Sequence, residues 1–369
     1  MRMKNIAIIG ASYLQLPLIE KAQSMGFVTH VFAWKANDVG ETAADYFYPI
    51  SIVEREQILE KCREIGICGI CSIGSDLAML TVNYVAEKLG LPGNSMRATQ
   101  LSTNKHLMRK AFFKHGDPSP RSIEVDASTD ISKLTLDFPV IVKPTDRSGS
   151  RGIYKLDTIE GLEAAVRSSL SEGFEKKALI EEFAEGTEYS VEHISYQGKH
   201  YFLAMTLKFT TGAPHFIETG HLEPAPVDAA TLERVKSVVS HALDSLEITD
   251  GASHAELKID SSGQIKLIEI GGRMGGDCIG SDLVYYSTGY DFVKMVINVA
   301  CGKAPDFTRY VKPQPVRVQF ILTQDDLDLF DKMRQETPEK IIRVPYLKRE
   351  AINQTTDSSN RAGCYIYYA

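Results

Sequence analysis

The sequence has little of three things: long apolar runs, paired cysteines and basic charge in excess. No apolar run among its 369 residues approaches the roughly 18 residues of a membrane-spanning helix. The N-terminal apolar run, Ile6–Ala11, is short and leads into a polar stretch, so we expect no signal peptide. The 41 basic and 48 acidic residues leave a net charge of −7, which does not favour nucleic acid as a partner. We therefore expect a cytoplasmic protein with neither a membrane nor a nucleic-acid partner.

Cysteine is scarce, with six in the chain, and Cys68 and Cys71 form its single CxxC. Because no second pair completes a zinc site, we interpret these residues as core thiols in a reducing compartment. Glycine-rich nucleotide motifs are also missing. Gly10 lacks the GxGxxG of a dinucleotide site, and the Walker pattern, GxxxxGK followed by Ser or Thr, is absent. The sequence also lacks a convincing Ser/His/Asp or Cys/His set for nucleophilic catalysis.

The composition, 43% hydrophobic and 24% charged, is typical of a globular protein, and the length predicts two or three domains. The chain begins with a strand at 5–10, a helix at 18–25 and a strand at 28–33. This order is typical of a doubly wound α/β sheet. A helix at 77–89 ends before the Pro/Gly cluster at 91–94, which we interpret as the first domain boundary.

Residues 254–277 carry the pattern on which the functional prediction depends: two short strands around a Ser-Ser-Gly turn, then a glycine-rich loop. If Asp260 pairs with Ile265 across the turn, Glu256 lies opposite Glu269. One apolar face then holds Ala255, Leu257, Ile259, Ile268 and Ile270. Opposed carboxylates repel, so we predict a cation between them, most economically Mg²⁺ bound to nucleotide phosphates. The alternative is an ordinary surface hairpin with a mobile loop.

The loop after this hairpin, Gly-Gly-Arg273-Met-Gly-Gly276, sets four glycines around one arginine. Glycines let backbone N–H groups approach an anion closely, and the guanidinium of Arg273 can bind a carboxylate or phosphate through two hydrogen bonds. We therefore predict an anion site at this loop.

Two further segments carry chemistry only in combination with the hairpin. Lys143 ends the strand that starts at Phe138, and a loop of small residues follows, which is one way to hold phosphates. Glu218 and His221 bracket a glycine in a turn-rich segment. They could hold an ammonium group and transfer a proton, or they could belong to an exposed polar loop.

The order of these motifs resembles the ATP-grasp superfamily of carboxylate–amine ligases. It runs from a basic helix at 102–110 through a Val-Lys-Pro strand, a Gly-Ser-x-Gly loop and a Glu-Glu-Phe hinge to the paired-glutamate hairpin and the Gly-Gly-Arg loop. The resemblance implies an α/β and α+β fold in which two lobes clasp ATP. Its expected parts are a doubly wound, Rossmann-like pre-ATP-grasp domain at 1–92, a connecting helical segment at 93–137, the small lobe or lid at 138–185, and the large lobe with the metal and substrate site at 186–369.

The resemblance also implies a role for each matching residue. Phosphate contacts are expected from Lys105, Lys143 and the closing loop with Ser148, Gly149 and Ser150. Adenine and ribose contacts are expected from Glu181, the backbone of Ala184, and Glu188. The metal, Mg²⁺ with Mn²⁺ as an alternative, is expected on Glu256 and Glu269. Many members carry Asn two residues after the second glutamate, where this chain has Gly271. We expect water or another residue to replace that ligand.

Within the superfamily, the details resemble the bacterial L-amino-acid (dipeptide) ligases. Glu218-Thr-Gly-His221 is similar to their ExGH segment, whose glutamate meets the substrate's amino group. The loop after the hairpin is similar to the one that stabilises the tetrahedral intermediate, through Arg273 and the Gly276 N–H. This resemblance implies activation of a carboxylate as an acyl phosphate, its transfer to an amine and release of ADP, with small molecules as substrates. By family analogy we expect a homodimer and a reduced C-terminal cap.

Two other functions remain open at this stage. In one, bicarbonate is the acid, as in biotin or carbamoyl-phosphate-type carboxylation. In the other, the protein is a nucleotide-binding sensor without turnover, although the full set of lysines and glutamates argues against it.

Overall fold

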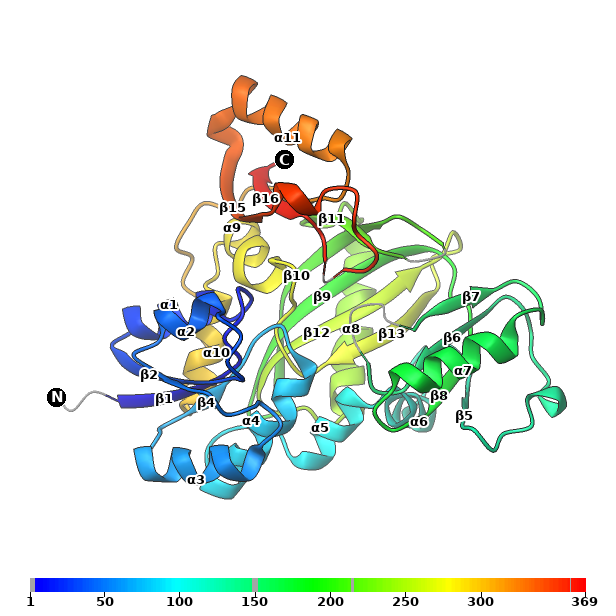
Figure 1. Ribbon diagram of the computed structural model, residues 1–369, viewed down its shortest axis with the longest axis horizontal. Coiled ribbons are helices and arrows are strands. Elements are labelled where there is room, and N and C mark those ends of the chain that lie inside the picture. Colours follow the sequence, from blue (N-terminus) through cyan, green and yellow to red (C-terminus); the bar gives the residue numbers. More distant parts are fainter. Residues whose placement is uncertain (1–3, 148–151, 214–215, 359) are drawn as a thin grey trace.

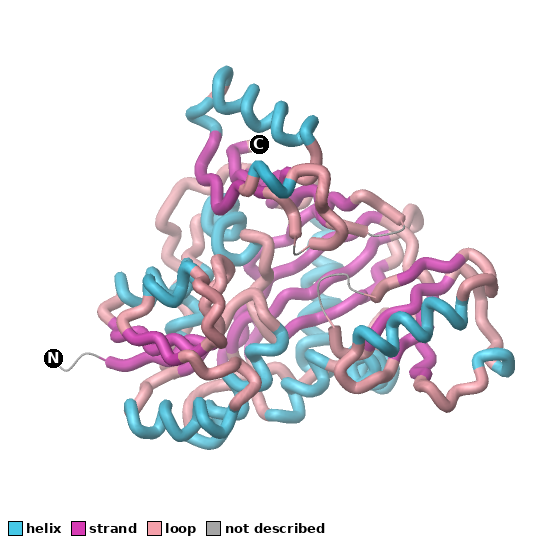
Figure 2. Tube along the Cα trace, viewed as in Figure 1, coloured by secondary structure: helices cyan, strands magenta, loops and turns pink. Residues whose placement is uncertain are grey.

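The structure is a computed structural model that describes residues 4–147, 152–213, 216–358 and 360–369. The strands of the described residues form three sheets, and Figure 2 draws these strands as magenta stretches of the tube. The first is parallel, in the order β3-β2-β1-β4, with β1 at Lys4–Ile9, β2 at Phe27–Phe32, β3 at Tyr46–Tyr48 and β4 at Ile70–Cys71. Its helices are α1 (Leu16–Ser24), α2 (Val39–Ala43), α3 (Arg55–Ile65) and α4 (Asp76–Leu89). Residues Ile6–Ile9 are fully buried, as expected of a parallel strand covered on both faces.

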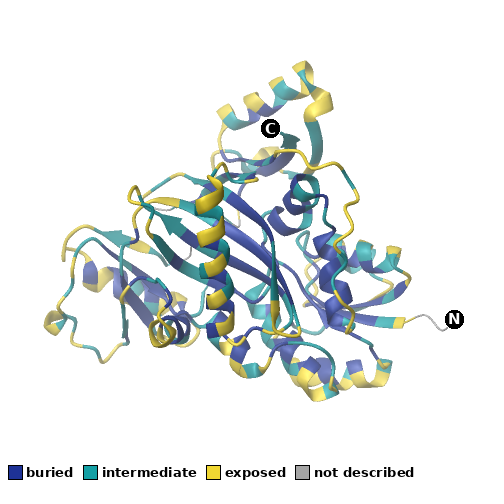
Figure 3. Cartoon of the chain, turned by 180° about the vertical axis from the view of Figure 1, so that it is seen from behind, coloured by how far each residue is buried: buried dark blue, intermediate teal, exposed yellow. Residues whose placement is uncertain are grey.

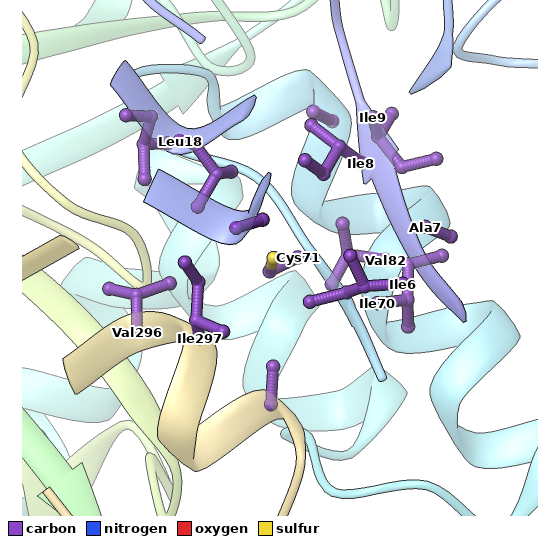
Figure 4. Packing of buried hydrophobic residues seen from close by; sticks show 14 of the residues in the cluster. Ile6, Ala7, Ile8, Ile9, Leu18, Ile70, Cys71, Val82, Val296 and Ile297 are labelled. Carbon is purple, nitrogen blue, oxygen red and sulfur yellow. The ribbon is translucent and has the colours of Figure 1, made fainter. Parts of the chain in front are cut away.

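The core of this first unit does not close within residues 1–92, the span expected for the pre-ATP-grasp domain. Helix α10 (Phe292–Ala300), far along the chain, packs against α1 and β4. Figure 4 shows Val296 and Ile297 of this helix beside Leu18 and Cys71. A parallel sheet needs helices on both faces, and the large lobe supplies one of them.

The second sheet is antiparallel, in the order β5-β8-β6-β7, with β5 at Ser122–Val125, β8 at Ala178–Glu182, β6 at Val140–Pro144 and β7 at Tyr154–Leu156. Helix α7 (Leu162–Glu172) covers one face around a core that includes Val140, Leu162 and Ile180. The stretch 93–137, expected to be a helical connection, holds helices α5 (Met96–Thr103) and α6 (Lys105–His115), and it also supplies β5 to this sheet.

The third sheet has eight strands in the order β13-β12-β9-β10-β11-β14-β16-β15. Their bounds are β13 Ile265–Gly271, β12 Gly251–Ile259, β9 Thr187–Tyr196, β10 Lys199–Thr210, β11 Glu218–Glu223, β14 Val316–Ile321, β16 Gly363–Tyr368 and β15 Ile341–Leu347. The C-terminal strands β14, β16 and β15 extend the sheet towards the top of Figure 1, where helix α11 (Gln324–Glu336) packs against β14. Shorter elements are α9 (Val284–Thr288), a π-helical turn at Ile279–Leu283, and 3₁₀ turns at Ile131–Lys133, Pro338–Lys340 and Arg349–Ala351.

The two faces of this sheet differ in chemistry at β9, β10, β12 and β13. One face is apolar and packs under the long helix α8 (Ala229–Ser245), which crosses the strands in Figure 3. Its core includes Val191, Met205, Leu257 and Val239. Because side chains alternate along a strand, the residues between them form a polar face.

The predicted pairing of Glu256 with Glu269 is confirmed, although the turn is not as expected. Ile259 rather than Asp260 pairs with Ile265, and the register shifts between Glu256 and Leu257. Ile268 is the extra residue of this β-bulge, and it lines the pocket beside Glu269 instead of joining the apolar face. The bulge thus restores the opposition of the two glutamates.

Among the described residues, no helix combines the length and apolarity needed to cross a bilayer.

Candidate active site

A pocket between the eight-stranded sheet and the small antiparallel sheet gathers most of the predicted site residues. Eight of these residues line it: Lys105, Lys143, Glu181, Ala184, Glu188, Glu218, Glu256 and Glu269. They come from α6, β6, β8, the bend after β8, β9, β11, β12 and β13. Three predicted residues do not line it: His221, Arg273 and Gly276. Ser148, Gly149 and Ser150 lie outside the described residues.

Lys208, on β10, is the centre of charge on the polar face. Its Nζ lies 2.8 Å from Oε1 of Glu256, 2.8 Å from Oε1 of Glu188 and 3.9 Å from Oε1 of Glu218. Burial alone would lower the pKa of Lys208, but these three carboxylates raise it well above its ordinary value. The ammonium group is therefore charged at neutral pH and holds the three glutamates in one cluster.

Glu269 has a lysine of its own. Nζ of Lys105, the first residue of α6, lies 2.9 Å from Oε1 of Glu269 and donates a second hydrogen bond of 2.7 Å to the carbonyl of Arg147. The positive charge predicted between the opposed glutamates is thus supplied, in this structure, by two lysine ammonium groups. The two lysines come from different elements, Lys208 from β10 of the large sheet and Lys105 from α6.

Glu181 lies between two buried cations. Its Oε2 is 2.6 Å from Nζ of Lys143, and its Oε1 is 2.8 Å from Nε of Arg109. Burial would raise the pKa of Glu181, but these two cations lower it below its usual range. Arg109 also donates a 2.6 Å hydrogen bond to the carbonyl of Ile268 at the bulge. This guanidinium therefore connects the small sheet to the paired-glutamate hairpin.

Arg273 is held by the N-terminal domain. Its Nε and Nη2 donate to Oδ1 and Oδ2 of Asp76 at 2.9 and 3.1 Å, a bidentate pair. Asp76 opens α4, after Ser75 caps the helix. A Cβ placed on Gly271 would lie 2.7 Å from Oδ1 of Asp76. The Asp76 carboxylate thus occupies the space that an asparagine at 271 would need.

A buried polar chain connects the glycine loop to the hairpin. Glu192 contacts Nδ1 of His254 through Oε1 and accepts a 3.0 Å hydrogen bond from the N–H of Gly275 through Oε2. Nε2 of His254 lies 3.4 Å from Oε1 of Glu256. Burial would lower the pKa of His254, but Glu192 and Glu256 raise it to about 9.

The C-terminal segment reaches the predicted substrate residues. Arg361 is buried, stacks over the Phe320 ring at 3.6 Å and pairs with Asp277, the residue after the glycine loop. The other oxygen of Asp277 lies 3.7 Å from Nε2 of His221. His221 is 1% exposed and lies within strand β11, so the alternative of an exposed polar loop is wrong. The Ser358 hydroxyl donates a hydrogen bond to Glu218.

The donor set suits a divalent cation that also carries ligands of its own. Within the described ranges, no group of three or more His, Cys, Asp or Glu side chains is arranged to hold a metal. The opposed pair of carboxylates fits Mg²⁺, which commonly takes one or two carboxylates and completes its shell with phosphates and water. Among the described residues, six glutamates and four lysines line the pocket, an excess of negative charge that a divalent cation would offset.

The sequence analysis missed the residues that hold the predicted ones in place: Asp76, Arg109, Glu192, Lys208, His254 and Arg361. A local signal existed for three of them. Arg109 lies one helical turn after Lys105, and His254 lies two residues before Glu256 on the same face. Lys208 is a charge that directly follows the mostly apolar run 201–207 of its strand. Asp76, Glu192 and Arg361 have no such signal because their partners are distant in sequence.

The comparisons with known proteins agree on one fold. Residues 136–282 match the family model described as an ATP-grasp domain. The solved structure of an L-amino acid ligase from Bacillus licheniformis superposes with a TM-score of 0.83 at 24% identity, covering 100% of this chain and 93% of that chain. The ATP-grasp fold predicted from the order of the motifs is therefore confirmed.

Two curated relatives are ligases. The chain is 24% identical over 311 residues to the alanine–anticapsin ligase of Bacillus subtilis, covering 74% of this chain and 65% of the relative. It is 29% identical over 204 residues to the D-alanine–D-alanine ligase of Hydrogenovibrio crunogenus, covering 51% of this chain and 62% of the relative. The chain therefore spans less than two thirds of the length of these relatives.

Proposed function

We propose that this chain, which carries an ATP-grasp domain, is an ATP-dependent ligase that activates a carboxylate as an acyl phosphate and joins it to an amine. The carboxylate we propose is that of an amino acid, by analogy with the ligases to which the chain is similar. The observation that carries the proposal is the shared pocket of Lys105, Lys143 and the opposed pair Glu256 and Glu269.

In this proposal the nucleotide binds between the two sheets. Lys105 and Lys143 face its phosphates, and Glu181, Ala184 and Glu188 face the adenosine, because all five line one pocket. Glu256 and Glu269 hold Mg²⁺ or Mn²⁺, which would neutralise phosphate charge as phosphoryl transfer proceeds. Lys105 and Lys208 then exchange part of their contact with these glutamates for contact with the incoming anion.

The acid and the amine meet at the edge of this pocket nearest the glycine loop. A carboxylate is a poor electrophile, and its phosphorylation by ATP supplies a leaving group without any nucleophilic side chain. Glu218 accepts hydrogen bonds from the substrate ammonium group, and His221 lies beside it on the same strand. Arg273 and the Gly276 N–H donate to the oxyanion when the amine attacks; the loss of one such donor costs on the order of 10²–10³ in rate.

ADP release tests the proposal directly. The protein with ATP and Mg²⁺ is screened against amino acids, singly and in pairs, by phosphate detection, with ligated products identified by mass spectrometry. We expect phosphate release that depends on both an acid and an amine. Phosphate release that needs bicarbonate but no amino acid would replace this function with a carboxylation. Nucleotide binding without phosphate release on any pair would indicate a sensor.

The role of Arg273 is tested on the pairs found in that screen. Arg273→Ala removes the donor, whereas Asp76→Asn keeps Arg273 and weakens its bidentate partner. We expect a loss of about 100-fold or more in turnover for Arg273→Ala, because one oxyanion donor is removed. Wild-type turnover by Arg273→Ala on every productive pair would show that the assignment is wrong.

A further inference from the structure

Glu192 and His254 are neighbours on the polar face of the large sheet, between the glutamate pair and the glycine loop. The register of β9 and β12 places them directly opposite one another. Both are buried, with side-chain exposures of 0% for Glu192 and 6% for His254. Neither lines the nucleotide pocket, and the mechanism proposed above gives them no task.

Glu192 and His254 form a continuous chain of polar contacts between Glu256 and the backbone of Gly275. Oε1 of Glu256 lies 3.4 Å from Nε2 of His254, and Nδ1 of the same ring contacts Oε1 of Glu192. The other oxygen of Glu192 accepts from the Gly275 N–H at 3.0 Å. One carboxylate and one imidazole therefore connect the side chain of Glu256 to the backbone of the loop that contains Gly276.

The glycine loop also packs closely against Glu192 and His254 at Gly275. A Cβ on Gly275 would lie 2.6 Å from Oε1 of Glu192 and 2.7 Å from Nδ1 of His254. Only a residue without a side chain fits there, so any movement of Glu192 or His254 reaches the loop through direct contact. Buried hydrogen-bonded pairs of this kind have few alternative arrangements, because each unpaired polar group is costly.

We propose that Glu192 and His254 are positioning residues that couple occupation of Glu256 by the metal ion to the placement of the Gly275–Gly276 backbone. The proposal rests on the proposed function, which places the metal on Glu256 and an oxyanion donor at Gly276. Metal binding fixes the Glu256 carboxylate, the carboxylate fixes the His254 ring, and Glu192 transfers that orientation to the Gly275 N–H. The oxyanion donors are then ordered only when the metal and its nucleotide are in place.

Glu192→Gln is the test variant, because the amide keeps the size of the carboxylate but removes its charge and one acceptor. Glu223→Gln is the matched control. Glu223 is equally buried on the same sheet face, but its partners are the hydroxyl groups of Thr206 and Ser287, outside the Glu256–Gly275 line. Both substitutions replace a buried carboxyl group with an amide of nearly the same size and leave the fold's apolar contacts unchanged.

The readout is hydrogen–deuterium exchange of a peptide covering residues 271–278, measured with and without Mg²⁺ and a non-hydrolysable ATP analogue. We expect Mg²⁺ and nucleotide to slow this exchange at least tenfold in the wild type and in Glu223→Gln. In Glu192→Gln we expect less than threefold slowing, while the calorimetric affinity for Mg²⁺ with nucleotide changes less than threefold. In steady-state assays, the same variant should lose kcat with little change in the KM for ATP.

Three results would overturn the inference. If Glu192→Gln keeps the wild-type slowing of exchange, the chain of contacts through Glu192 and His254 does not couple the metal site at Glu256 to the glycine loop. If both variants lose it equally, Glu192 acts only through general stability. If the wild type binds Mg²⁺ and nucleotide but shows no slowing, the loop is ordered beforehand and only this inference fails. Absence of nucleotide binding by the wild type would instead remove the proposed function and the inference together.

Discussion

Replacing Glu181 with glutamine tests the electrostatics of the pocket most directly. Among the described residues, Glu181 is the one carboxylate that pairs with both Lys143 and Arg109, and the side-chain exposures of Glu181, Lys143 and Arg109 are 3%, 6% and 3%. The amide would leave two buried cations without their shared counter-charge. Glutamine has nearly the same volume, so packing changes little and the effect is mainly electrostatic.

The expected loss in the free energy of unfolding is about 3–5 kcal/mol, the usual result of removing one partner from a buried ion pair. Lys143 limits this loss, because burial already lowers the pKa of its ammonium group, and it can lose its proton. The unfolded chain then binds more protons at this site than the folded protein does. Stability of the variant therefore rises with pH towards the ordinary lysine pKa of 10.5, and the loss shrinks as the pH approaches that value.

Urea unfolding followed by far-ultraviolet circular dichroism measures this loss. Fluorescence is a poor probe, because the single tryptophan, Trp34, is exposed in the N-terminal domain. Glu182→Gln is the matched control: the next residue pairs with Lys266 and Arg121 at the partly exposed rim, where about 1 kcal/mol or less is expected. A loss below about 1 kcal/mol for Glu181→Gln, or a loss that grows from pH 7 to pH 10, would refute the reasoning.

Three further predictions concern stability. Gly271→Ala places a Cβ 2.7 Å from Oδ1 of Asp76, so we expect the free energy of unfolding to fall by about 1–3 kcal/mol. In the double variant, Asp76→Ala should recover part of this loss; additive losses in a double-mutant cycle by urea unfolding would show that the Cβ and the Asp76 carboxylate do not clash. Arg361→Met removes a buried guanidinium from the partly buried Asp277, which keeps its 3.7 Å contact with Nε2 of His221. We expect a cost of about 3–5 kcal/mol in urea unfolding, against about 1 kcal/mol or less for Arg349→Met at the more exposed Asp331 pair; equal losses would show that burial of the arginine does not matter. Burial, with Glu192 adding to it, raises the pKa of Glu223 from 4.5 to about 7, so the folded state binds this proton more tightly and stability falls as the pH rises through that window. Glu223→Gln removes this term, and its stability relative to the wild type should rise across the same window by at most about 3 kcal/mol; parallel pH profiles would exclude a raised pKa.

The sequence by itself determined the first parallel strands, the order of the motifs and the opposition of Glu256 and Glu269. These features depend on local periodicity and on residue types that phosphates and metal ions require, so they can be read without knowing distant neighbours. The ATP-grasp fold was predicted from the resemblance of six motifs, in order, to that superfamily, and the roles assigned to the individual site residues remain predictions.

Only the tertiary structure decided which groups balance those charges. Arg273 meets Asp76 from 197 residues away, Asp277 meets Arg361 from 84, and Lys105 meets Glu269 from 164. The bulge at Ile268 and the packing of α10 on the N-terminal sheet are likewise set by neighbours from other segments. An ion pair or a covered sheet face depends on distance in space, and the spacing of residues along the chain does not determine that distance.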